Sequence, residues 1–199
     1  MLTKKRRKFD KISVKIGKIF SKTGLTPNNF TLLTVLSAAV TLYFITSERF
    51  LLAALFILIT GFLDFVDGSV ARFTKKSTKS GAYLDTIVDR YVEFIIIFSF
   101  IFIELPYLLL PAMVWIFLYL FGSMMTTYSK AAAMEKSIIK KELSSGIIER
   151  GERFLILFVG VFLAFFDKSF LLYVIIILAL LTNITALQRI FLVLRRSHV

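Results

Sequence analysis

The sequence predicts an all-α integral membrane protein in which six transmembrane helices follow an N-terminal amphipathic helix at the membrane interface. Two observations support this fold class. The 199 residues are 57% apolar with a mean hydropathy of +0.80, which is more apolar than an ordinary soluble domain. The apolar residues also gather in six segments of roughly 17–22 residues, close to the length of helix that spans a bilayer core of about 30 Å.

The first 22 residues carry nine of the 25 lysines and arginines. Apolar residues fall mostly on one side of a helix and basic residues occupy much of the rest, a pattern typical of a helix that lies on a membrane surface. A nucleic-acid-binding arm and a solvated basic tail are the alternatives. We expect residues 1–23 to form this juxtamembrane helix and residues 24–199 to form the membrane domain. The apolar positions are Phe9, Ile12, Val14, Ile16, Ile19 and Phe20.

Short polar or proline-containing segments separate the predicted spans. Pro27 is suited to the first turn of the first span, because proline lacks only an N–H that has no partner there. The expected spans are Phe30–Thr46, Phe50–Val66, Ala82–Ile103, Tyr107–Thr127, Phe154–Phe166 with a start earlier in 146–153, and Ser169–Leu187.

An even number of spans places both termini on one side of the membrane. That side would carry 22 of the 25 basic residues. Because cytoplasmic segments are rich in Lys and Arg, we expect both termini to be cytoplasmic in a multi-pass protein of the cell membrane.

Four of the six aspartates lie close together in the sequence. Asp64 and Asp67 are three residues apart, and Asp85 and Asp89 are four apart, so each pair shares a helix face. Measured from the polar turn between them, both pairs lie on the order of 7–15 Å into a helical hairpin. Carboxylates are ligands for hard divalent cations such as Mg²⁺, Mn²⁺ or Ca²⁺. We expect one or two ions, Mg²⁺ or Mn²⁺, on the cytoplasmic side. The alternative is that these are scattered charges paired with Arg72 or Arg90.

Other chemistries are excluded by composition. The chain has no cysteine, which rules out disulfides, thiolate nucleophiles and zinc–thiolate sites. Its single histidine, His198, is next to the C-terminus, which argues against a Ser-His-Asp site. The net charge of +12 fits anionic lipid, and with the long apolar segments it indicates a membrane and no nucleic-acid partner.

The aspartates also belong to a longer pattern, Asp64-x2-Asp67-Gly68-x2-Ala71-Arg72-x8-Gly81-x3-Asp85-x3-Asp89. This pattern resembles the signature of the CDP-alcohol phosphotransferase family at every defined position and gap. The resemblance implies a divalent-metal-dependent membrane enzyme of phospholipid biosynthesis and a homodimer. It implies that Asp64, Asp67 and Asp85 are metal ligands, and that Asp89 is the catalytic general base and also lies near the metal.

Three further segments resemble the branch of the family that makes phosphatidylinositol phosphate or archaetidylinositol phosphate. They are the Thr-Pro-Asn-Asn element, a Glu-Arg-x-Glu-Arg element and a Gln-Arg near the C-terminus. The residues implied to bind the CDP-linked donor are Thr26, Pro27, Asn28, Asn29, Asp64, Asp67, Gly68, Ala71, Arg72, Thr78, Gly81 and Asp85. Those implied to bind the acceptor phosphate are Lys130, Arg150, Arg153 and Arg189.

The resemblance implies transfer of a phosphatidyl or archaetidyl group from a CDP-linked lipid to a small phosphorylated alcohol, with release of CMP. It favours inositol 1-phosphate as the acceptor. Ala132 stands where that branch has an arginine, so glycerol 3-phosphate stays open, as does a soluble CDP-polyol donor. A metal-ion transporter is the alternative from another class, because carboxylates within a membrane often mark ion paths.

Overall fold

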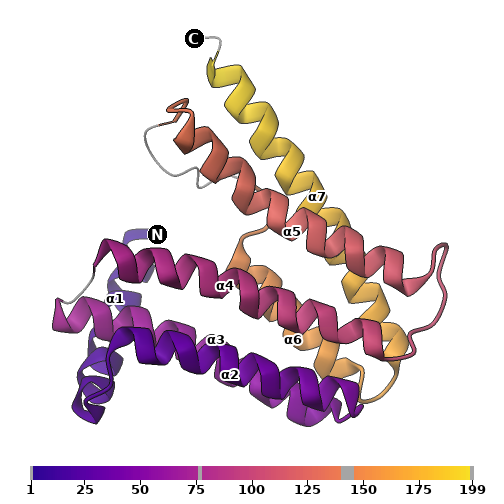
Figure 1. Cartoon of the computed structure of the whole chain (residues 1–199), viewed down its shortest axis with the longest axis horizontal. Helices are drawn as coiled ribbons and strands as arrows, with labels where there is room; N and C mark the ends of the chain where they lie inside the picture. Colours follow the sequence, from indigo (N-terminus) through magenta and orange to yellow (C-terminus); the bar gives the residue numbers. More distant parts are fainter. Residues whose placement is uncertain (1, 76–77, 140–145, 198–199) are drawn as a thin grey trace. The chain divides into compact units, whose positions relative to one another are not determined.

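The computed structural model describes residues 2–75, 78–139 and 146–197, with side chains from residue 11 onward except at 196–197. These residues form α-helices and short 3₁₀ helices, and no β-strand occurs among them (Figure 1). Parts of the predicted turn at 74–80 and of the polar segment at 130–152, and also His198, lie outside the described residues. The elements are α1 (Leu2–Phe20), η1 (Ser21–Thr23), α2 (Pro27–Thr46), α3 (Phe50–Thr74), α4 (Lys79–Ser99), η2 (Phe100–Phe102), α5 (Ala112–Glu135), α6 (Arg150–Leu163) and α7 (Lys168–Ser197).

The chain divides into two compact units. The first comprises residues 1–44 and 52–96 and contains α1, most of α2 and α3, and nearly all of α4. The second comprises residues 45–51 and 97–199 and contains α5, α6 and α7. All four aspartates of the signature belong to the first unit, whereas the cations of the predicted acceptor site belong to the second.

Four of the described helices are long and apolar enough to cross a membrane: α2, α3, α5 and α7. The other two predicted spans correspond to α4 and α6. Helix α4 carries Asp85, Asp89, Arg90 and Glu93 within 21 residues, which lowers its hydropathy. Helix α6 has only 14 residues, fewer than the roughly 20 needed to cross a bilayer core.

The fourth predicted span begins later in the structure than the sequence suggested. We expected a helix from Tyr107, but α5 begins at Ala112, directly after Pro111. The residues before it are held in a non-helical conformation in which Leu109 has a φ of 60°. The Trp115 indole N–H donates to the Leu108 carbonyl at 3.1 Å, and the Tyr107 hydroxyl donates to the Leu109 carbonyl at 2.9 Å. Residues 107–111, which the sequence predicted to be helical, are therefore part of the connection that precedes α5.

Hydroxyl side chains join α2 to α3 within the first unit. The Thr60 hydroxyl lies 2.8 Å from Ser37 Oγ, and Ser37 Oγ donates to the Phe56 carbonyl at 3.2 Å. Small residues and hydroxyls of this kind let helices approach closely in a membrane, where apolar surface alone gives little drive for association. These contacts hold the α2–α3 pair, which carries much of the site described below.

In the second unit, α5 and α7 lie side by side (Figure 1) and meet closely at Gly122. A Cβ at Gly122 would collide with Thr182 Oγ1 and the Asn183 side-chain amide. Asn183 Nδ2 also donates to the Leu118 carbonyl at 2.9 Å, which places a polar bond between the two helices. Only glycine leaves room for this approach.

We expect Gly122→Leu to lower the stability of the detergent-solubilised protein by about 1–3 kcal/mol, because overpacking forces the helices apart. Thermal unfolding followed by tryptophan fluorescence measures the effect. Gly151→Leu is the matched control, since a Cβ at Gly151 meets no atom within 4 Å. An unchanged Tm for Gly122→Leu would contradict the close packing of α5 on α7.

Candidate active site and metal centre

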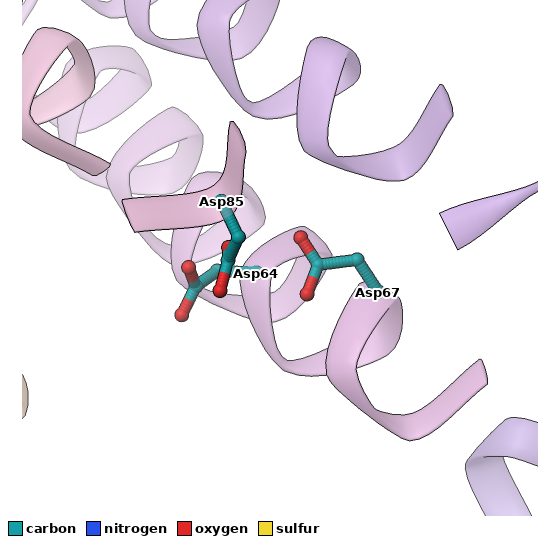
Figure 2. Close-up of side chains that lie close together, drawn as sticks. All are labelled: Asp64, Asp67 and Asp85. Carbon is teal, nitrogen blue, oxygen red and sulfur yellow. The ribbon is translucent and has the colours of Figure 1, made fainter. Parts of the chain in front are cut away.

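Three aspartates converge in the first unit. Asp64 and Asp67 project from α3 and Asp85 from α4, and one carboxylate oxygen of each lies within 4.8 Å of the others. Figure 2 shows the three carboxylate groups near one another, with that of Asp85 between those of Asp64 and Asp67 in this view. Asp67 is the most buried of them, at 5% exposure. Three oxygen ligands at this spacing suit a hard divalent cation.

Asp89 lies one turn after Asp85 on α4 and is half-buried. It is not a member of the three-carboxylate cluster among the described residues. The structure therefore brings together three of the four aspartates singled out by the sequence pattern.

A hydroxyl from α2 orients the most buried carboxylate. Thr31 Oγ1 lies 3.1 Å from Asp67 Oδ2 and 3.2 Å from the Pro27 carbonyl, so its single proton is directed toward these acceptors. Thr31 is itself buried, at 4% exposure. The sequence analysis missed this residue, although it follows Pro27 by four positions and so shares its helix face.

A pocket of about 180 Å³ opens beside the carboxylates, between α2, α3 and the start of α4. Nine of the twelve residues predicted to bind a CDP-linked donor line it: Pro27, Asn28, Asp67, Gly68, Ala71, Arg72, Thr78, Gly81 and Asp85. Thr31 and Ala82 complete the lining. The pocket combines two carboxylates, an arginine and small residues.

The other three predicted donor residues are Asp64, Thr26 and Asn29. Asp64 belongs to the carboxylate cluster. Thr26 precedes the first residue of α2, and its hydroxyl donates to Asn29 Oδ1 at 2.6 Å. The Asn29 N–H in turn donates to the Thr26 carbonyl at 3.0 Å. In the structure these two residues stabilise the start of the helix that carries Pro27 and Asn28.

A second concentration of charge lies in the second unit, where two arginines meet one threonine. Arg153 Nη1 donates to Thr126 Oγ1 at 3.3 Å, and Arg189 Nη1 donates to the Thr126 carbonyl at 2.6 Å. Arg153 is 2% exposed and Arg189 is 4% exposed. Helices α5, α6 and α7 thus direct two guanidinium groups to one point.

The remaining predicted acceptor cations belong to the same helix faces. Lys130 follows Thr126 by one turn on α5, and Arg150 precedes Arg153 by three residues at the start of α6. Both are half-buried. Glu149 and Glu152 form a capping box that fixes this helix start, with the Glu149 N–H donating to Glu152 Oε2 at 2.9 Å. Thr126 was missed by the sequence analysis, although it lies four positions before Lys130.

Comparison with known proteins identifies the family. The model of the CDP-alcohol phosphatidyltransferase family matches residues 24–194. The chain belongs to this family. This membership favours group transfer over the ion-transport alternative. The chain is a transferase of phospholipid synthesis.

Individual relatives of the CDP-alcohol phosphatidyltransferase match most of the chain. An archaetidylinositol phosphate synthase of Pyrococcus horikoshii is 34% identical over 163 residues, covering 80% of this chain and 81% of that protein. The crystal structure of Mycobacterium tuberculosis phosphatidylinositol phosphate synthase with CDP-DAG bound has a TM-score of 0.79 at 25% identity, covering 92% and 94% of the two chains. Another structure of that synthase, in complex with manganese and citrate, has a TM-score of 0.80 at 24% identity and covers 92% and 88%.

The residues present fit a divalent metal in this family member. The cluster offers only oxygen ligands, and its three carboxylates would repel one another without a cation between them.

Proposed function

We propose that this enzyme transfers the phosphatidyl or archaetidyl group of a CDP-linked lipid to inositol 1-phosphate and releases CMP. The product is phosphatidylinositol phosphate or archaetidylinositol phosphate. The observation that carries the proposal is the three-carboxylate cluster with a pocket beside it in the first unit. The second unit separately holds two buried arginines. The archaetidylinositol phosphate synthase relative supports the choice of acceptor.

The residues around the pocket are assigned to the donor. Pro27, Asn28, Gly68 and Ala71 form an uncharged wall against which the cytidine half can lie, and Arg72 supplies positive charge to a phosphate. Asp64, Asp67 and Asp85 would hold one or two Mg²⁺ or Mn²⁺ ions. When bound, the metal neutralises the pyrophosphate and stabilises the leaving phosphate.

Asp89 is assigned as the general base. The acceptor hydroxyl forms a new P–O bond to the phosphorus that carries the lipid, its proton passes to the Asp89 carboxylate, and the P–O bond of the anhydride breaks to release CMP. We assign a carboxylate to this role because the chain has no cysteine and its one histidine is next to the C-terminus.

Arg153 and Arg189 are assigned to the phosphate of the acceptor, together with Lys130 and Arg150. Guanidinium groups bind phosphate oxygens in a planar, two-pronged geometry, and burial strengthens such bonds. Thr126 holds both buried guanidinium groups at one point. A neutral acceptor such as inositol or serine offers no phosphate oxygen for these guanidinium groups to bind.

The proposal includes a membrane arrangement. Residues 24–199 form a transferase domain with six spans, the two shorter ones being α4 and α6, and α1 lies at the cytoplasmic interface. Both termini and the site face the cytoplasm, and the enzyme acts as a homodimer. The positive-inside distribution supports the orientation, and family resemblance supports the dimer.

CMP release from purified protein with CDP-diacylglycerol and Mg²⁺ tests the proposal. Inositol 1-phosphate, glycerol 3-phosphate, inositol and serine are compared as acceptors, with EDTA as the metal-free control. We expect release with inositol 1-phosphate that stops on chelation. Preference for glycerol 3-phosphate would overturn the acceptor assignment alone. Absence of release with every acceptor, together with turnover of a soluble CDP-polyol, would overturn the donor assignment.

We expect Arg189→Gln to raise the KM for inositol 1-phosphate by about 10- to 100-fold, because it removes a charge-assisted bond to phosphate. The KM for the CDP-linked lipid should stay the same, since that pocket is built from the first unit. Arg195→Gln is the charge-matched control on the same helix, at an exposed position. Equal changes in the two KM values would argue for general loss of structure.

A further inference from the structure

The N-terminal helix α1 contacts α3 directly beside the donor pocket. A Cβ added at Gly17 would collide with the Ser69 carbonyl oxygen and lie 2.7 Å from Phe73 Cβ, so the two helix backbones approach closely there. Phe20 adds edge-to-face contacts with Phe30 of α2 and Phe62 of α3, at centroid distances of 5.9 and 5.7 Å. Helix α1 therefore packs against the helices that form the pocket.

Ser13 lies one turn before Gly17 on the same face of α1 and is 6% exposed. Its Oγ accepts from Arg72 Nη2 at 2.8 Å and from Arg72 Nε at 3.2 Å. It also lies 3.0 Å from Ser69 Oγ, a side chain with no exposed surface. One buried hydroxyl thus contacts two nitrogens of the guanidinium group that lines the donor pocket.

The direction of these hydrogen bonds follows from the number of protons available. Ser69 Oγ donates its only proton to the Phe65 carbonyl at 2.7 Å, so Ser13 is the donor toward Ser69. The lone pairs of Ser13 Oγ are then directed to Arg72, which is always a donor. The resulting chain runs from Arg72 through Ser13 and Ser69 to the backbone of α3.

This anchoring fixes which part of Arg72 is available to a ligand. Ser13 accepts from Nε and Nη2, and Nη2 also donates to Ser69 Oγ at 3.5 Å. In contrast, Nη1 lies 3.3 Å from the position of a Cβ on Gly68, a pocket residue. Arg72 is otherwise an exposed side chain with several rotatable bonds. Holding such a side chain in one orientation before binding removes an entropy cost from the binding step.

We propose that Ser13 is a positioning residue for the donor: it presents the Nη1 edge of Arg72 to a phosphate of the CDP-linked substrate. Ser13 is not among the residues that line the pocket, so it acts through Arg72. The inference rests on the proposed function, because it assumes that this pocket receives the donor. It gives the N-terminal helix a role in substrate affinity.

The test is a double-mutant cycle on the binding of CDP-diacylglycerol, measured by calorimetry with Mg²⁺ present. Ser13→Ala is expected to weaken binding about five- to tenfold, as loss of one hydrogen bond to a charged group predicts. In an Arg72→Ala background the same substitution is expected to have no further effect. Additive losses would overturn the proposal, since loosening of α1 alone would weaken binding whether or not Arg72 is present.

Two controls keep the outcomes distinct. Ser21→Ala removes another hydroxyl of this region, one that donates to the Lys18 carbonyl, and should bind the donor like the wild type. In turnover assays Ser13→Ala should raise the KM for the donor and leave the KM for the acceptor unchanged. If the wild type binds no CDP-diacylglycerol, the proposed function fails. If the wild type and Ser13→Ala bind it equally, only the role of Ser13 fails.

Discussion

Asp85→Asn is expected to reduce CMP release by about a thousandfold or more, because a catalytic metal contributes several kcal/mol of transition-state stabilisation. Asn keeps the size of the side chain and removes one negative charge from a cluster of three carboxylates whose oxygens lie within 4.8 Å of one another. The affinity for Mn²⁺, measured by electron paramagnetic resonance in the absence of substrate, should fall in parallel.

The control for this variant is Asp167→Asn. Asp167 is an exposed aspartate whose Oδ1 accepts the Ser169 N–H at 2.7 Å at the start of α7. Asn caps a helix about as well as Asp, so this variant should retain activity and stability. If Asp85→Asn binds Mn²⁺ as tightly as the wild type does, Asp85 is not a ligand of the ion.

Asp89→Asn is expected to lower kcat by about 10²–10⁴-fold, the usual contribution of a positioned general base. Asp89 is outside the three-carboxylate cluster, so Mn²⁺ affinity and CDP-diacylglycerol binding should change little. Single-turnover measurement of CMP formation separates the chemical step from product release.

The two aspartate variants together distinguish a base from a ligand. If Asp89→Asn weakens Mn²⁺ binding as strongly as Asp85→Asn does, Asp89 is a metal ligand and its effect on kcat follows from loss of the ion. If Asp89→Asn keeps full activity, the base must be another group. Because Asn cannot take up the proton, raising the pH within the stable range should not restore the rate.

Spacing predicted the carboxylate cluster but also placed Asp89 in it, and the structure leaves Asp89 outside the cluster. Residues three apart on one helix and a residue of the next helix at matching depth were enough to bring Asp64, Asp67 and Asp85 together. The same periodicity would have found Thr31, one turn after Pro27. The contact of Arg153 and Arg189 with Thr126 depends on how α5, α6 and α7 pack, and no local pattern encodes it.

The errors in helix boundaries also have a physical origin. Hydropathy predicts where an apolar segment begins. A helix begins where its first backbone N–H groups, which have no partner within the helix, can be accommodated. Leu110 directly precedes Pro111, and the residue before a proline disfavours the α conformation, so the helix does not begin in this apolar segment. In the opposite direction, α5 continues to Glu135 and α7 to Ser197, since polar residues extend a helix beyond its apolar part.

The chain keeps its two assigned chemistries in separate stretches of sequence. Residues from Pro27 to Asp89 carry the carboxylates and the pocket, and residues from Thr126 to Arg189 carry the buried cations. A lineage could therefore alter the head group of its lipid product through changes in α5–α7 while nucleotide handling stayed under separate selection.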